Sequence, residues 1–200
     1  MKIKNIIFDF GGVIVDWNPR YMYEKVFDDK YEMEDFLTNI CTEEWNLQQD
    51  KDRSLVEGTE ILIKKFPEYA ELIGLFYDRW EEMLKGSIDQ NVKLIYLLKK
   101  KYKLFGLTNW SAETFPIALK RFSFFQEFDG IVVSGIEKMI KPDSEIFYLL
   151  LHRYQLKAHE SVFIDDNIKN IIAAKEIGFH VIHINETINL EEELNKMKII

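Results

Sequence analysis

Short apolar runs and segments of helical periodicity alternate from Gly86 to the C-terminus. The runs KLFGLT, DGIVVS, SVFID and HVIHI are short enough for strands, and Ile6 to Phe8 forms another such run. Apolar runs without polar alternation are typical of strands buried on both faces of a parallel sheet. Between them, QNVKLIYLLKKK, AETFPIALKRF, SEIFYLLLHRY and IKNIIAAKEIG have helical spacing, the second interrupted by Pro116. This alternation predicts an α/β fold with a doubly wound parallel sheet.

The segment between the first strand and this alternating region has a helical pattern throughout. Asn18-Pro19 places a capping residue before a proline, which is typical of a helix start. Apolar residues recur at helical spacing through EMEDFLTNI and SLVEGTEILIKKF, and Pro67 is expected to open a long helix that reaches Leu84. We therefore predict a core formed by residues 1–16 and 86–200 and an inserted helical cap formed by residues 17–85. The tail NLEEELNKM predicts a short exposed helix.

Composition narrows the classes of function. Two hundred residues, of which 47% are apolar, suffice for one domain with an insertion. The net charge of −8 and the lack of a basic face argue against a nucleic-acid ligand. The single cysteine, Cys41, excludes an intrachain disulfide, and no stretch of the sequence reaches membrane-spanning length. We expect a cytoplasmic monomer or weak homodimer, without nucleic-acid or membrane partners.

Polar residues of particular kinds follow the predicted strands. They are Asp9 after the first strand, Thr108 and Asn109 after KLFGL, Lys141 in the segment after GIVVS, and Asp165 and Asp166 after SVFI. Because ligands of open α/β sheets bind beyond the carboxyl ends of the strands, we expect these residues to converge at one edge of the sheet.

This set of side chains suits phosphoryl transfer. Asp9 can act as a nucleophile that carries the phosphoryl group as an aspartyl-phosphate. Mg²⁺ prefers oxygen ligands, which Asp9 and Asp166 provide with help from Asp165. Lys141 can neutralise charge on the transferring group. Thr108 and the backbone N–H groups of the helix that follows it can hold phosphate oxygens.

Four motifs in this order, FDFGGV, LTN, KP and DDNIKN, resemble those of the haloacid dehalogenase-like hydrolase superfamily. The helical cap and the VIVD continuation are similar to its sugar-phosphate phosphatases of the glucose-1-phosphate type. The resemblance implies Asp9 as nucleophile, Thr108 and Asn109 as phosphate-binding residues, Lys141 as charge stabiliser, Asn170 as stabiliser of the fourth motif, and Mg²⁺ bound by Asp9, the backbone carbonyl of Gly11 and Asp166, with Asp165 nearby. We expect a Mg²⁺-dependent phosphatase of small phosphorylated metabolites.

One position departs from the family pattern. Most phosphatases that this chain resembles have a second aspartate two residues after the nucleophile, which protonates the leaving oxygen. Here Gly11 occupies that position and supplies no acid. Asp16 is the nearest other acid, but a role at the hinge or start of the cap is the stronger expectation. General acid assistance contributes ~10²–10⁴-fold in rate, so we expect substrates with stabilised leaving oxygens to be favoured.

Two other functions stay open. A catalytically quiet protein that binds a phosphorylated ligand or another protein would also tolerate Gly11. A 2-haloacid dehalogenase belongs to a branch that lacks the second acid too, but it does not need the pair Asp165-Asp166.

Candidate substrate contacts lie in the predicted cap. Arg20, near its hinge, either reaches an anionic group or is solvated. Trp45 lies in the polar stretch WNLQQDKDR between cap helices, which suits a sugar ring and suits an exposed linker equally well.

Overall fold

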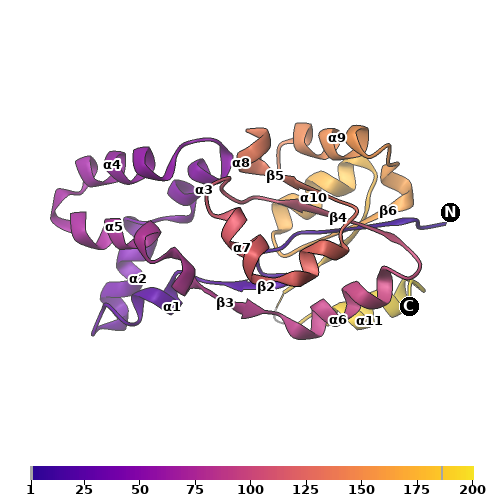
Figure 1. The fold of residues 1–200 in the computed structure, drawn as a ribbon, viewed down its shortest axis with the longest axis horizontal. Coiled ribbons are helices and arrows are strands. Elements are labelled where there is room, and N and C mark those ends of the chain that lie inside the picture. Colours follow the sequence, from indigo (N-terminus) through magenta and orange to yellow (C-terminus); the bar gives the residue numbers. More distant parts are fainter. Residues whose placement is uncertain (1, 186) are drawn as a thin grey trace.

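A five-stranded parallel sheet forms the centre of the molecule (Figure 1). The computed structural model describes residues 2–185 and 187–200. The strand order is β5-β4-β1-β6-β7, and each neighbouring pair is parallel. The strands are β1 (Asn5–Phe8), β4 (Lys103–Thr108), β5 (Gly130–Val133), β6 (Ser161–Asp165) and β7 (His180–His183). The predicted doubly wound α/β fold is confirmed.

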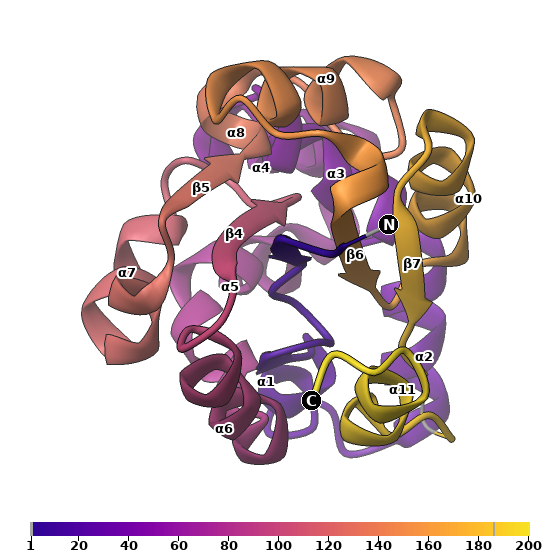
Figure 2. The ribbon, with the colours of Figure 1, turned by 90° about the vertical axis from the view of Figure 1, so that its right-hand side faces the viewer.

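Helices cover both faces of this sheet (Figure 2). On β1, Ile6 and Phe8 belong to one cluster of buried apolar side chains and Ile7 to another, because successive strand residues point to opposite faces. The first cluster includes residues of α6 and α11, and the second includes residues of α9 and α10. The elements of this part are α6 (Asp89–Leu98), α7 (Phe115–Arg121), η3 (Ser123–Glu127), α8 (Ser134–Glu137), α9 (Ser144–Arg153), η4 (Ala158–Glu160), α10 (Ile168–Ile177) and α11 (Leu190–Lys196).

Between β1 and α6 the chain leaves the sheet and returns. It leaves through β2 (Val15–Trp17) and comes back through the antiparallel strand β3 (Leu84–Ser87). Residues 18–83, which we call the helical insertion, lie at the end of the molecule opposite the N-terminus (Figure 1). Its elements are α1 (Arg20–Tyr23), α2 (Lys30–Asn39), α3 (Glu43–Lys51), α4 (Leu55–Lys65), η1 (Pro67–Tyr69), α5 (Ala70–Asp78) and η2 (Trp80–Met83).

Three helices of the insertion begin at side chains that accept backbone N–H groups. Asp29, Thr42 and Ser54 cap α2, α3 and α4 in this way, which satisfies donors that a helix start otherwise leaves unpaired. The helices therefore begin where the sequence offers a cap. No helix of the described chain combines the length and apolar character needed to cross a bilayer.

Two expectations about helices are wrong, one in the insertion and one in the core. The long helix from Pro67 to Leu84 is instead η1, α5 and η2, and Leu84 already lies in β3. The helix ends because the chain pairs with the outgoing strand, where the backbone N–H of Asn18 donates to the carbonyl of Met83. Pro116 does not interrupt α7 but lies in its first turn, where the missing N–H of proline costs no hydrogen bond.

Candidate active site

Three carboxylates converge at the carboxyl ends of the central strand β1 and its neighbour β6. Asp9 follows β1, while Asp165 ends β6 and Asp166 comes next. Phe8 and Ile164 pair in register, so the residues after them emerge side by side. One carboxylate oxygen of each aspartate lies within 4.8 Å of the others, a spacing that fits a hard divalent cation with oxygen ligands. The predicted convergence of these acids is therefore present in the structure.

Lys141 joins this group as a buried cation. Its Nζ lies 3.0 Å from Oδ2 of Asp9 and 2.6 Å from Oδ2 of Asp165. Asn109 fixes the backbone of the same lysine, because its Nδ2 donates to the Lys141 carbonyl (2.9 Å) and its Oδ1 accepts from the Lys141 N–H (2.9 Å). The amide of Asn109 is thus engaged in positioning Lys141, and its contact with phosphate stays a prediction. Thr108, buried at the end of β4, lies at the same edge of the sheet.

Burial and crowding set the charges of the site. Burial raises the pKa of Asp9 to about 7; Lys141 acts against this, while Asp165 and Asp166 add to it. Burial also raises the pKa of Asp166, with Asp165 as a further cause. Burial alone would lower the pKa of Lys141, but Asp165 and Asp9 together raise it, so the ammonium stays charged. One lysine cannot neutralise three carboxylates, and a divalent cation would relieve the remaining repulsion.

Asp165 and Asp166 differ in their surroundings. Asp165 accepts from Nδ2 of Asn170 (3.0 and 3.1 Å) and from the backbone N–H of Asn167 (2.8 Å), besides its contact with Lys141. Its oxygens are thus held by the protein, which agrees with the role expected for Asn170. The carboxylate of Asp166 is more exposed, and its backbone carbonyl lies 2.9 Å from Nε2 of His183 on β7. His183 carries no motif, so the sequence analysis did not single it out as part of this site.

Gly11 and Gly12 differ in whether the structure requires glycine at their position. Gly12 has φ of +68°, and a Cβ on it would lie 2.1 Å from Oδ2 of Asp166. Only glycine fits this turn without displacing the acid. A Cβ on Gly11, by contrast, would have no atom of the described residues within 4 Å. Space and backbone conformation therefore do not require glycine at position 11.

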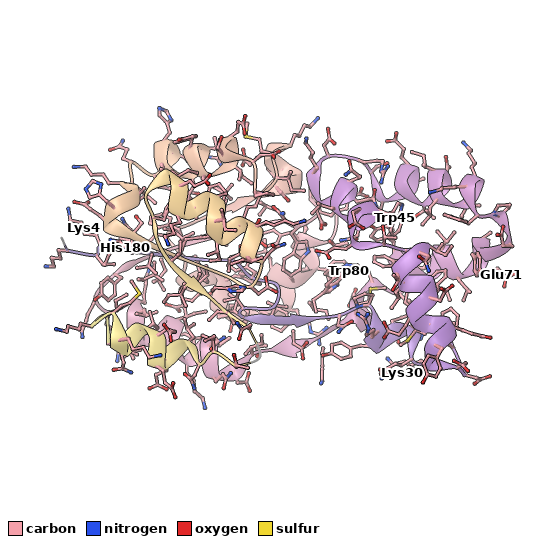
Figure 3. All side chains as sticks on the ribbon, turned by 180° about the vertical axis from the view of Figure 1, so that it is seen from behind. Lys4, Lys30, Trp45, Glu71, Trp80 and His180 are labelled. Atoms are coloured by element: carbon pink, nitrogen blue, oxygen red, sulfur yellow. The ribbon has the colours of Figure 1, made fainter. Side chains whose placement is uncertain are left out.

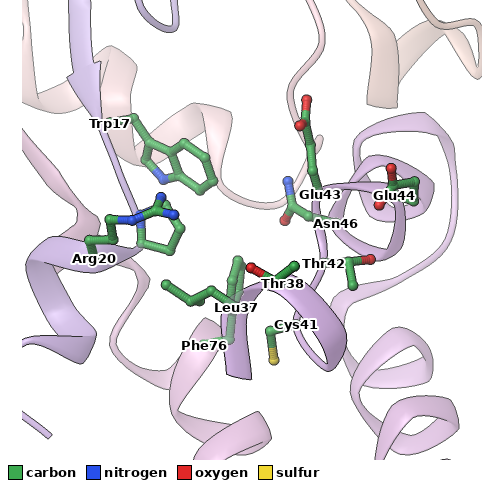
Figure 4. A pocket seen from close by; sticks show the side chains of 11 residues that line it. Trp17, Arg20, Leu37, Thr38, Cys41, Thr42, Glu43, Glu44, Asn46 and Phe76 are labelled. Atoms are coloured by element: carbon green, nitrogen blue, oxygen red, sulfur yellow. The ribbon is translucent and has the colours of Figure 1, made fainter. Parts of the chain in front are cut away.

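Two adjoining cavities connect this edge of the sheet with the helical insertion. The inner cavity, of about 80 Å³, is lined by Gly11, Trp17, Asn46, Asp50, Trp80, Asn109, Trp110 and Thr114. The outer cavity, of about 440 Å³, lies within the insertion (Figure 4) and falls in the size range of small-molecule sites. Trp17 and Asn46 line both cavities. Figure 3 shows Trp80 near the junction of insertion and core.

The outer cavity has walls of mixed character. Trp17, Leu37 and Phe76 give it apolar surface, while its polar surface comes from Arg20, Thr38, Thr42, Glu43, Glu44 and Asn46. Among the described residues, Nε1 of Trp17 is a buried polar side-chain atom without a hydrogen-bond partner. Buried N–H groups are normally paired, so this donor is available to an oxygen of a bound molecule.

The candidate contacts of the insertion lie elsewhere than expected. The stretch around Trp45 is not an exposed linker but helix α3, capped by Thr42. Trp45 is buried, donates from Nε1 to the carbonyl of Gly58 (3.0 Å) and packs edge-on against Phe76. Among the described residues it does not line either cavity, because it faces the core of the insertion, and its contact with a sugar ring stays a prediction without support from this geometry.

Arg20 and Asp16 occupy structural positions. The guanidinium of Arg20 forms a two-pronged ion pair with Glu34 (2.6 and 2.5 Å) at the rim of the outer cavity. Much of its charge is therefore already neutralised. Asp16 lies on β2 and accepts from the hydroxyl of Tyr21 (2.8 Å), which agrees with a role at the start of the insertion.

Comparisons with known proteins agree with this geometry. The model of a family described as haloacid dehalogenase-like hydrolase matches residues 6–184. Sesquiterpene phosphatase astK of Aspergillus oryzae is 26% identical over 97% of this chain and 96% of its own. D-Ribitol-5-phosphate phosphatase of Bacteroides thetaiotaomicron is 26% identical over 96% of this chain and 97% of its own.

Solved structures share the fold. A HAD family enzyme of Bacteroides thetaiotaomicron, crystallised with magnesium and inorganic phosphate, superposes with a TM-score of 0.71. It is 20% identical and covers 96% of this chain and 98% of its own.

Proposed function

Because this chain belongs to the haloacid dehalogenase-like hydrolase family, we propose that it is a Mg²⁺-dependent phosphatase of small phosphorylated metabolites that works through an aspartyl-phosphate. The observation that carries this proposal is the cluster of Asp9, Asp165 and Asp166 around the buried ammonium of Lys141. A nucleophilic carboxylate, oxygen ligands for a hard cation and a fixed positive charge are the parts that phosphoryl transfer requires.

The residues take separate roles in the proposed reaction. A carboxylate oxygen of Asp9 attacks phosphorus, and the leaving oxygen departs with the electrons of its bond to phosphorus. Lys141 stabilises the negative charge that the phosphoryl oxygens carry during transfer. Thr108, at the end of β4, holds one of these oxygens, and Asn109 keeps Lys141 in place.

The metal would be held by Asp9, the backbone carbonyl of Gly11 and Asp166. When bound, Mg²⁺ supplies charge neutralisation between the carboxylates and the phosphate. Asp165 would support these ligands without direct contact with the metal, since its oxygens already bind Lys141, Asn167 and Asn170.

The helical insertion, residues 18–83, serves as the cap in this proposal. The outer cavity receives the alcohol part of the substrate, and its mixed walls suit an organic group that carries a few oxygens. The relatives that span the chain are named for a sesquiterpene phosphatase and a D-ribitol-5-phosphate phosphatase, so the family context supports alcohols of very different polarity. Sugar phosphates therefore form one arm of the substrate panel and prenyl alcohol phosphates another.

A direct experiment tests the function. We expect hydrolysis of 4-nitrophenyl phosphate in Mg²⁺, no hydrolysis after the metal is removed with EDTA, and none by Asp9→Asn in Mg²⁺. Failure of the wild-type protein to hydrolyse any aryl or alkyl phosphate in Mg²⁺ would favour the catalytically quiet binding protein. Fluoride release from fluoroacetate without metal would favour a dehalogenase.

A further inference from the structure

We propose that Asp50, on α3 of the helical insertion, is the general acid that position 11 does not provide. The inference rests on the proposed phosphatase function and adds to it the origin of the proton for the leaving oxygen. It changes the expectation drawn from Gly11 alone, because poor leaving groups then become substrates too.

The position of Asp50 is the first argument. Asp50 lines the inner cavity together with Gly11 and Asn109, which belong to the loops after β1 and β4. Gly11 stands two residues after the proposed nucleophile, so this cavity opens beside the place where a leaving oxygen would be released. Asp50 thus supplies a carboxyl group beside Gly11, where the chain itself has no acidic side chain.

The core of the protein holds Asp50 in place. The buried hydroxyl of Ser134, at the start of α8, donates to the backbone carbonyl of Asp50. The same hydroxyl accepts from the backbone N–H of Trp110 (2.8 Å), the residue after Asn109. Nearby, the backbone N–H of Leu55 donates to the carboxylate of Glu113 (2.8 Å). The acid is therefore fixed to the loop that carries Thr108 and Asn109, although it belongs to the insertion.

The surroundings of the carboxyl suit proton donation. Three indoles, of Trp17, Trp80 and Trp110, line the cavity with it, and Nδ2 of Asn46 donates to its Oδ2 (3.0 Å). Withdrawal from water raises the pKa of Asp50 to about 7, although a hydrogen bond from the backbone of Ser111 acts against the shift. An acid with a pKa near the working pH is protonated often enough to give its proton and basic enough to recover it.

The proton balance of the reaction is complete with this residue. In the first step Asp9 forms the new bond to phosphorus, the bond from phosphorus to the leaving oxygen breaks, and the proton of Asp50 moves to that oxygen. The products are an alcohol, the aspartyl-phosphate and an Asp50 carboxylate. In the second step water attacks phosphorus and gives a proton to Asp50, the bond to Asp9 breaks, and inorganic phosphate leaves.

The dependence on the leaving group tests the proposal. Kinetics in Mg²⁺ over a series of aryl and alkyl phosphates should give a shallow dependence of kcat/KM on the pKa of the leaving alcohol for the wild type. Asp50→Asn keeps the shape and the contact with Asn46 but has no acidic proton. It should lower kcat/KM for alkyl phosphates by ~10²–10⁴-fold while 4-nitrophenyl phosphate is much less affected. Asp52→Asn, on an exposed neighbour that lines neither the inner nor the outer cavity, is the matched control and should follow the wild type.

A rescue makes the test specific. Because a Cβ on Gly11 would meet no described atom within 4 Å, Gly11→Asp can place an acid at the usual position of the family. In the Asp50→Asn background it should restore alkyl phosphate hydrolysis, at least in part. A role of Asp50 in folding alone predicts no such rescue.

Two results would overturn the assignment of Asp50 while leaving the phosphatase function intact. An equal loss for aryl and alkyl phosphates in Asp50→Asn would indicate a structural role. A leaving-group-dependent loss in Glu43→Gln, with none in Asp50→Asn, would move the acid to the other end of α3. The phosphatase proposal itself fails only if the wild type lacks Mg²⁺-dependent hydrolysis that Asp9→Asn abolishes.

Discussion

The ammonium of Lys141 lies between two carboxylates that would otherwise repel each other. Because Lys141 is buried, with its Nζ 3.0 Å from Asp9 and 2.6 Å from Asp165, the removal of its charge leaves uncompensated acids inside the protein. We expect Lys141→Met to lower the free energy of unfolding in EDTA by about 3–5 kcal/mol, as for other broken buried pairs. Urea titration monitored by circular dichroism measures the change.

A surface pair provides the comparison. The side chains of Lys4 and Glu160 also form an ion pair at 2.8 Å, but Lys4 is exposed to solvent. Lys4→Met should cost about 0–1 kcal/mol, because solvent screens such pairs. Equal losses for the two variants would contradict the account of Lys141.

The raised pKa of Asp9 predicts a pH dependence of stability. Burial raises this pKa from 3.8 to about 7 in the metal-free protein. Between these values the folded state keeps a proton that the unfolded state has released, so the contribution of Asp9 to stability falls as pH rises. Asp9→Asn removes this contribution. The free energy of unfolding of the variant relative to wild type, measured in EDTA, should therefore increase from pH 5 to pH 8.

Magnesium should act in the opposite direction. A cation bound to the Asp9 carboxylate competes with the proton, so Mg²⁺ should stabilise the wild type more at pH 8 than at pH 5. Asp9→Asn should gain less from the metal at both values. A pH-independent difference between the two proteins in EDTA would refute the assigned titration.

At the level of residues, the sequence predicted site residues correctly where an acidic side chain lies at the end of a strand. Asp9 and Asp165 could be placed together because parallel strands end at one edge of the sheet. Ser134 and His183 could not be found in this way. Their partners are the backbone carbonyls of Asp50 and Asp166, which every residue type offers, so no pattern of side chains marks these contacts.

At the level of elements, the local sequence pattern was sufficient to predict strands of the central sheet. β4 and β6 have the predicted bounds, since each is a short run without charged residues between two polar ends. The short strands β2 and β3 escaped prediction, because each pairs with a partner far away in the sequence and neither has a pattern of its own. The same pairing explains why the helix predicted from Pro67 breaks before Leu84.

The contact between α3 and the core depends on one hydroxyl. Ser134→Ala leaves the carbonyl of Asp50 and the N–H of Trp110 without this partner in a buried place. We expect a loss of about 1–3 kcal/mol in unfolding free energy, the usual cost of unpaired buried groups. We also expect a loss in alkyl phosphate hydrolysis that exceeds the loss for aryl phosphates, because Asp50 is no longer held in position.

An exposed serine serves as the control for this prediction. Ser144→Ala, at the first residue of α9, should change stability by less than ~0.5 kcal/mol, as surface substitutions usually do. Chemical denaturation and the phosphate ester series measure both effects. Identical behaviour of the two variants would show that α3 does not need Ser134 to dock.

At the level of the whole molecule, one apolar cluster joins the sheet to the insertion. It contains Phe8 and Phe10 near the site as well as Phe36 and Phe76 within the insertion. Because these side chains belong to one continuous buried cluster, we expect a single cooperative unfolding transition. Circular dichroism, which reports all helices, and tryptophan fluorescence, which mostly reports the insertion and its junction, should give the same midpoint in urea. Two separate midpoints would indicate that the insertion unfolds by itself.

The strand order also affects how this protein emerges from the ribosome. β1 lies in the middle of the sheet yet is synthesised first, and its neighbours β4 and β6 begin only at Lys103 and Ser161. Until then the nascent chain displays an apolar strand with two open edges, which attracts other chains. Both of its pairings join distant segments, so we expect the sheet to close slowly and late in synthesis. The early synthesis of Ile6, Ile7 and Phe8 therefore predicts that the nascent chain needs chaperones until β4 and β6 are made.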